Sequence, residues 1–132
     1  MTHSRRSWLY LAFLAGVLAV GIPYWRMPYG QVNLPSALMT PALAVVVVAA
    51  CLARAGRTAS FWRVVLVVGS SVPAAVFMRV VADTSGDPTS HNLWPFEVII
   101  ALMVGLSCSL GGAAAAMIGA MIRTSQPAER RS

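Results

Sequence analysis

The sequence predicts an all-α, polytopic membrane protein with four transmembrane helices. Long apolar runs, few charged residues and the placement of the arginines together indicate this class. Of the 132 residues, 58% are hydrophobic and only 11% are charged, and the mean hydropathy is +0.71. A soluble domain carries about 25% charged residues, so this chain lacks the charges to cover a surface in water. We interpret residues 1–132 as a single integral membrane domain.

Four apolar segments predict the helices, at about 8–25, 36–53, 62–82 and 95–122, with an outer loop at 83–94. A helix needs about 20 residues to cross roughly 30 Å of hydrocarbon. The first two segments are slightly short for this and the fourth is long. We therefore expect the fourth helix to tilt or to extend beyond the bilayer.

The arginines predict the orientation, because eight of the ten flank one side of the predicted bundle. These are Arg5, Arg6, Arg54, Arg57, Arg63, Arg123, Arg130 and Arg131, and only Arg26 and Arg79 fall on the other side. Positive charge collects on the cytoplasmic side of membrane proteins, so both termini are expected in the cytoplasm. The net charge of +6 then reflects topology rather than nucleic-acid binding. An arginine-only, alanine-rich chain favours a bacterial source, hence a multi-pass protein of the bacterial inner membrane.

The N-terminus allows a second interpretation. Residues 4–9, Ser-Arg-Arg-Ser-Trp-Leu, resemble a twin-arginine export signal, and Ala19 and Gly21 could form a small-residue cleavage site. Tyr24 and Trp25 instead resemble an aromatic anchor at the outer interface. Whether the first helix is a cleaved signal stays open from the sequence.

The outer loop and its edges hold the main group of polar side chains. Asp83, Asp87 and Glu97 are three of the four acidic residues, and His91 is one of two histidines. Histidine with carboxylates can bind a divalent metal, but this spacing fits no known ligand motif, so we predict no metal site. We expect a structured loop in which Asp87, His91 and Asn92 offer an external recognition surface.

Arg79 is the most informative single residue, because it lies about one turn inside the outer end of the third helix. A charge in the membrane is costly and usually has a partner. Asp83 follows at i+4, and Glu97 begins the fourth helix on the same side. A structural pair of Arg79 with Asp83 or Glu97 is expected, with the guanidinium reaching outward. The alternative is a charge relay or an anion site.

Small residues recur along the fourth helix at four-residue spacing, which lets helix backbones approach closely in lipid. The predicted packing residues are Gly105, Ser109, Gly112, Ala116, Gly119 and Ala120. Two rows have this spacing. One contains Gly112, Ala116 and Ala120, and the other contains Gly111, Ala115 and Gly119. These rows predict either association with a partner or second copy, or packing against the protein's own helices.

Pro73 lies inside the third predicted helix, within Gly69-Ser70-Ser71-Val72-Pro73. Proline removes a backbone hydrogen bond and kinks a helix, and nearby serine hydroxyls can bond the freed carbonyls. We therefore predict a kink and a hinge at Pro73. A broken helix is common in transporters, but proline is also ordinary in membrane helices.

No catalytic motif, no histidine within a predicted span and no acidic residue deep in a span is present. We therefore predict a non-enzymatic scaffold or accessory subunit without a cofactor, which packs through the fourth helix. Its expected partners are the lipid bilayer and either further copies or another membrane protein, and not nucleic acid. The alternative is a small oligomeric transporter or channel with Arg79, Asp83 and Glu97 at its outer mouth. A membrane enzyme that uses the outer carboxylates on lipid-linked substrates is a third hypothesis.

Overall fold

The computed structural model describes residues 2–34, 36–89 and 91–125, which form helices joined by turns, with no β-strand among them. The predicted all-helical class is confirmed. The elements are α1 (Thr2–Arg26), η1 (Tyr29–Gln31), α2 (Leu43–Ala55), α3 (Phe61–Gly69), α4 (Ser71–Gly86) and α5 (Trp94–Ser125). The element η1 is a single 3₁₀ turn.

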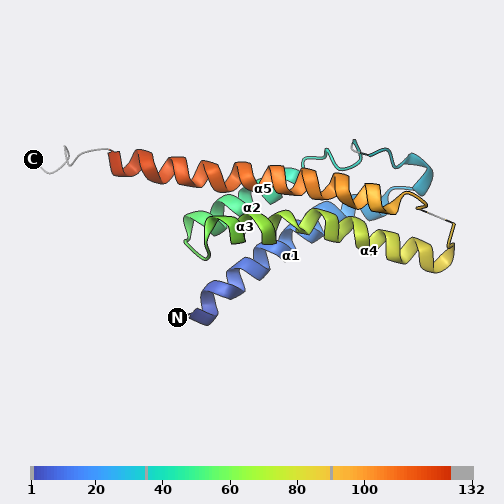
Figure 1. The fold of residues 1–132 in the computed structure, drawn as a ribbon, viewed down its shortest axis with the longest axis horizontal. Helices are drawn as coiled ribbons and strands as arrows, with labels where there is room; N and C mark the ends of the chain where they lie inside the picture. Colours follow the sequence, from blue (N-terminus) through green and yellow to red (C-terminus); the bar gives the residue numbers. More distant parts are fainter. Residues whose placement is uncertain (1, 35, 90, 126–132) are drawn as a thin grey trace, which may run out of the picture.

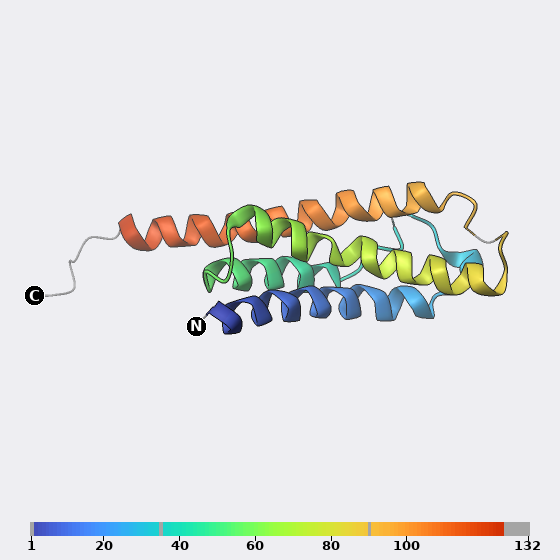
Figure 2. The same ribbon diagram turned by 60° about the horizontal axis from the view of Figure 1, so that its bottom comes forward.

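The helices lie side by side along one long direction (Figures 1 and 2). Helices α1 and α5 are the outer members, and each contacts α2, α3 and α4 between them. The start of α1 and the end of α5 point toward the same end of the molecule, and the connection from α4 to α5 lies at the other end. We call these two ends the terminal end and the loop end.

Three helical stretches are long and apolar enough to cross a membrane. They are Arg6–Arg26, Phe61–Gly86, which contains α3 and α4, and Trp94–Ser125. The last has 32 residues and extends about 48 Å at about 1.5 Å per residue. It is therefore longer than the roughly 30 Å of hydrocarbon, as its sequence predicts.

The second apolar segment differs from its prediction, because α2 begins at Leu43 and not at Ser36. With 13 residues, α2 covers only about 20 Å. Pro41 explains the late start, since proline donates no backbone bond and disfavours helix in the residue before it. Residues 36–42 form turns instead, in which the Leu43 amide donates to the Thr40 carbonyl at 3.0 Å.

The third predicted helix is broken at Ser70, between α3 and α4. Pro73 lies buried in the first turn of α4 and has no N–H, so the Gly69 carbonyl lacks its usual i+4 donor. The hydroxyls of Ser70 and Ser71 donate to carbonyls of the preceding turn, at 2.8 and 2.6 Å. The interruption follows from these residues, and the role of Pro73 as a hinge stays a prediction.

Helix α5 packs through small residues on its inner face. A Cβ atom on Gly105 would overlap the Gly69 carbonyl, and one on Gly112 would overlap the Val47 carbonyl. The Ser109 hydroxyl donates to the Val65 carbonyl of α3 at 2.9 Å. These contacts bring the backbone of α5 against α2 and α3, as the spacing of the small residues predicts.

The other predicted packing residues lie elsewhere on α5. Around Gly111 and Gly119 an added Cβ would meet no atom within 4 Å. Ala116 and Ala120 line a cleft beside the end of α2. The small residues thus divide into an inner face, an outward face and a cleft.

Candidate functional site

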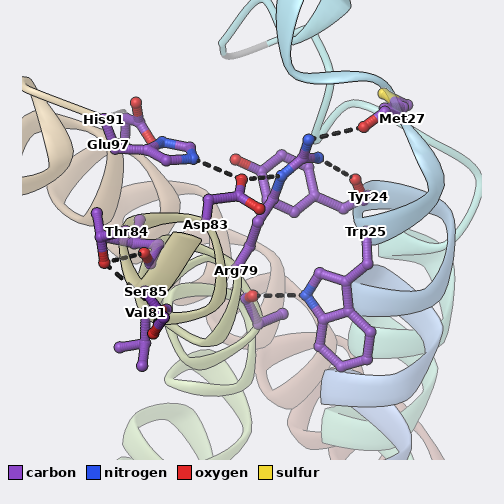
Figure 3. Close-up of polar contacts among 12 residues, drawn as sticks. Tyr24, Trp25, Met27, Arg79, Val81, Asp83, Thr84, Ser85, His91 and Glu97 are labelled. Carbon is purple, nitrogen blue, oxygen red and sulfur yellow. Dashed lines mark hydrogen bonds and ion pairs between the residues drawn. The ribbon is translucent and has the colours of Figure 1, made fainter. Parts of the chain in front are cut away.

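Arg79 on α4 is the centre of a polar cluster at the loop end (Figure 3). Its side chain is only 6% exposed, and each of its nitrogens has an acceptor. Nε donates to Asp83 Oδ2 at 3.1 Å, Nη2 donates to the Met27 carbonyl at 2.6 Å, and Nη1 donates to the Tyr24 carbonyl. The guanidinium carbon also lies 4.9 Å from the centre of the Tyr24 ring.

These bonds place a cation at the C-terminal end of α1, which ends at Arg26. The last carbonyls of a helix lack intrahelical donors and carry partial negative charge. Arg79 supplies donors to two of the carbonyls in this region, from Tyr24 and Met27. It therefore fastens the end of α1 to α4.

His91 joins the cluster to the start of α5. Its Nε2 lies 2.8 Å from Asp83 Oδ2 and its Nδ1 lies 2.8 Å from Glu97 Oε2, and its side chain is fully buried. A neutral imidazole has one N–H, whereas the imidazolium has two. Two ionised carboxylates are therefore both satisfied only by a protonated His91, which then bridges α4 and α5.

The backbone explains how His91 reaches this position. Its φ of 56° lies in the left-handed region, which histidine tolerates better than most side chains. The His91 carbonyl then accepts from the Trp94 amide at 2.9 Å, where α5 begins. The conformation reverses the chain and sets the ring between the two carboxylates.

Aromatic side chains reinforce the same end of the molecule. The indole Nε1 of Trp25 donates to the Ala75 carbonyl at 2.9 Å, which joins α1 to α4. The rings of Phe77 and Trp94 meet edge to face at 6.2 Å, which joins α4 to α5. Helices α1, α4 and α5 are thus held together by both polar and aromatic contacts.

The remaining predicted loop residues stand outside this bridge. Asp87 is exposed and accepts hydrogen bonds from the Thr89 hydroxyl at 2.7 Å and the Thr89 amide at 3.0 Å. These bonds favour the ionised form, so they hold the pKa of Asp87 below its ordinary value. Asn92 is also exposed. Both residues face solvent and do not contribute to the buried bridge.

Among residues 2–34, 36–89 and 91–125, no group of three or more His, Cys, Asp or Glu side chains is arranged to hold a metal. Each His91 nitrogen faces a different carboxylate. The ring therefore separates Asp83 from Glu97 and does not join them around a common centre.

The pairing of Arg79 is one of the two that the sequence allowed. Arg79 pairs with Asp83, while Glu97 binds His91 and not Arg79. The i+4 spacing is visible in the sequence. The main-chain acceptors of Tyr24 and Met27, and the bridging position of His91, have no comparable sequence signal.

His91→Asn is expected to loosen the connection between α4 and α5. The charged groups that face this ring are Asp83 and Glu97, with Arg79 behind Asp83. The variant removes the ring that contacts both carboxylates. Protection of the amides of residues 87–89 and 91–93 from hydrogen exchange should therefore be lower than in the unmodified protein.

Asparagine also tolerates a positive φ, so this variant tests the ring and not the backbone turn. Unchanged protection in His91→Asn would contradict the bridging position of the ring.

The cluster joins the loop ends of α1, α4 and α5 by hydrogen bonds and ion pairs between residues of this chain. Its geometry shows that these three ends are held together. No protein-family model, curated protein or solved structure was found to match this chain.

Proposed function

We propose that the protein is a small, non-enzymatic scaffold or accessory subunit of the bacterial inner membrane, which associates laterally through α5. The observation that carries this proposal is a row of exposed or half-buried small residues on the outward side of α5. The row contains Ser107, Gly111, Ala115 and Gly119, and we call it the outer small-residue face. An added Cβ on Gly111 or Gly119 would meet no atom within 4 Å.

The outer small-residue face suits a neighbouring helix better than lipid. In the most apolar 18 residues of α5, 28% of the residues are buried, against 61% in the stretch of α3 and α4 and 33% in α1. Among these three stretches, α5 therefore leaves the largest share of its residues free to contact a partner. Small residues at four-residue spacing expose backbone, and association in the bilayer depends on such close packing. A second copy of α5 or the helix of a partner protein would cover this row.

The polar cluster supports a structural role over the transporter or channel hypothesis. Arg79 donates to two carbonyls, one in the last turn of α1 and one just after it, and to Asp83. Glu97 faces His91. In a transporter or channel, these charged side chains would have to contact the substrate or ion at the outer opening. Here they are already bonded to other groups of the protein. A transporter would also require Arg79 to be dispensable for folding, which its burial opposes.

The arrangement of charges supports the proposed topology. The end of α2, the start of α3 and the end of α5 lie at the terminal end (Figure 2). These segments and the turn between α2 and α3 contain Arg54, Arg57, Arg63 and Arg123. The preference for positive charge on the cytoplasmic side then places the terminal end inside. In this proposal the second segment crosses as α2 together with the turns of residues 36–42, which gives four passes.

Replacing Gly111 with leucine is expected to abolish association while leaving the fold intact. The side chain would project from the outer small-residue face into open space and would block a close helix approach. Native mass spectrometry after gentle extraction from the membrane should show loss of the second copy or partner. Circular dichroism should show unchanged helix content.

The control is Val48→Leu, because Val48 is 53% exposed on α2 and the change adds bulk away from α5. It should leave the assembly intact. An unmodified protein that is monomeric and free of partners would refute the proposal. Unchanged assembly in Gly111→Leu would exclude this face.

A further inference from the structure

We propose that the end of α2 and the facing side of α5 form a binding site for the phosphate headgroup of an anionic phospholipid. A cleft of about 190 Å³ lies between them, and we call it the basic cleft. It is lined by Arg54, Ala55 and Arg57 at the end of α2 and by Ala116, Met117, Ala120 and Met121 on α5. No role at the polar cluster or in α5 association involves the two arginines.

Among the residues that the structure describes, the arginines of the basic cleft have no carboxylate partner. The ion pairs of the described residues all lie in the cluster of Arg79, Asp83, His91 and Glu97, at the loop end. Within the described chain, Arg54 Nε is buried and has no hydrogen-bond acceptor. A buried donor on a cation is costly without an acceptor. A phosphate in the cleft would pair with the guanidinium by a short, charge-assisted bond, and it would reach Nε only after the Arg54 side chain turns toward the cleft.

The turn after α2 brings Arg57 to the same cleft. Arg57 has a φ of 51°, at the position after a helix where glycine is usual. The Arg57 amide donates to the Arg54 carbonyl at 3.0 Å, and the Thr58 amide donates to the Ala53 carbonyl at 3.2 Å. An arginine held in a conformation that favours glycine points to a use for its side chain.

The apolar side chains on the α5 side of the basic cleft favour a lipid as the ligand. Met117 and Met121 offer flexible apolar surface, which an acyl chain can cover and a free phosphate cannot use. Phe61 and Trp62 begin α3, a few residues after the end of α2 in the sequence. Aromatic rings collect at the depth of the lipid headgroups, which is where a phosphate would lie. Basic pockets between membrane helices on the cytoplasmic side bind anionic headgroups.

The site rests on the proposed membrane orientation but not on association through the outer small-residue face. The test is native mass spectrometry of the full chain from nanodiscs that contain equal phosphatidylglycerol and phosphatidylcholine. The unmodified protein should retain phosphatidylglycerol selectively. Arg54→Gln and Arg57→Gln should each weaken retention about tenfold, as loss of one charge-assisted bond predicts.

Two further arginines provide matched controls. Arg63→Gln and Arg123→Gln remove the same charge near the same end but outside the basic cleft, so retention should stay close to that of the unmodified protein. Ala120→Leu keeps every charge and fills the basic cleft, so it should lose selective retention. This variant also tests the site if Arg54→Gln fails to fold. Gly111→Leu should retain the lipid even as a monomer, which separates this proposal from the association proposal.

Three results would overturn the site. Equal weakening by all four arginine variants would show diffuse attraction to the anionic surface. Equal retention of both lipids would show that the headgroup charge is not recognised. Displacement of phosphatidylglycerol by millimolar inorganic phosphate, with retention unaffected by Ala120→Leu, would identify a free-anion site in place of a lipid site.

Discussion

Arg79→Ala should destabilise the folded protein by about 3–5 kcal/mol, the cost of removing one member of a buried charged network. The change would leave the Tyr24 and Met27 carbonyls without their Arg79 donors and Asp83 without its guanidinium partner. Unfolding in mixed micelles, followed by circular dichroism against denaturing detergent, would measure the loss. Released contacts between α1 and α4 should appear as faster hydrogen exchange at the end of α1.

Arg26→Ala is the matched control, because Arg26 is the other arginine near this end and is exposed. Its effect should stay within about 0.5 kcal/mol, as for most surface substitutions. Arg79→Lys should fall between the two, since an ammonium cannot reproduce the planar fork of donors. Full stability in Arg79→Ala would contradict the fastening role, and it would favour the transporter hypothesis if a transport activity were lost at the same time.

Gly105→Ala should destabilise the protein by about 1–3 kcal/mol, the usual cost of forcing added atoms into a packed interior. The new methyl group would overlap the Gly69 carbonyl and stand 3.0 Å from Val72 Cβ. The Gly69 atom belongs to the backbone, so α5 and α3 would have to separate. The same micelle unfolding assay measures this change.

Gly111→Ala is the control for Gly105→Ala, on the same helix and with the same added methyl group. No atom of the same chain lies within 4 Å of that position. In micelles that keep the protein monomeric, the variant should therefore be neutral or more stable by up to about 1 kcal/mol, the helix preference for alanine over glycine. Equal destabilisation by both variants would contradict the described packing of α5.

The apolar runs were sufficient to predict the helical class and the three long helical stretches. They could not predict the late start of α2, because hydropathy reports where a segment is buried and not its backbone conformation. Residues 36–42 are apolar enough to extend the run, yet Pro41 and its neighbours favour turns. The break at Ser70 was predictable in part, from Pro73 and the adjacent serines.

The candidate site was predictable only where its partners lie on one helix. Arg79 and Asp83 share a helix face at i+4, so their pairing could be expected. Every residue has a carbonyl, so nothing in the sequence distinguishes those of Tyr24 and Met27 as acceptors. The contact of His91 with Glu97 depends on a left-handed turn that composition does not specify.

The small residues of α5 show the same limit in another form. Their spacing predicts close helix packing, but it does not say which row faces inward. Gly111 and Gly112 are neighbours, and only Gly112 has a backbone carbonyl against it. The direction of each face is decided by the position of α2, which lies far away in the sequence.

The short length of α2 has a consequence for the surrounding bilayer in the proposed orientation. At about 20 Å, α2 covers little more than one leaflet, whose hydrocarbon is about 15 Å thick. Beside the other leaflet lie the turns of residues 36–42, which include exposed Ser36 and whose backbone polar groups lack the regular bonds of a helix and require water or protein partners. Lipids there must thin to meet them. The protein thus thins the outer leaflet locally, on the side of α2. A neighbouring protein with an equally short helix at its surface would share this thinned region, so the total deformation energy of the pair would be lower than that of the two proteins apart.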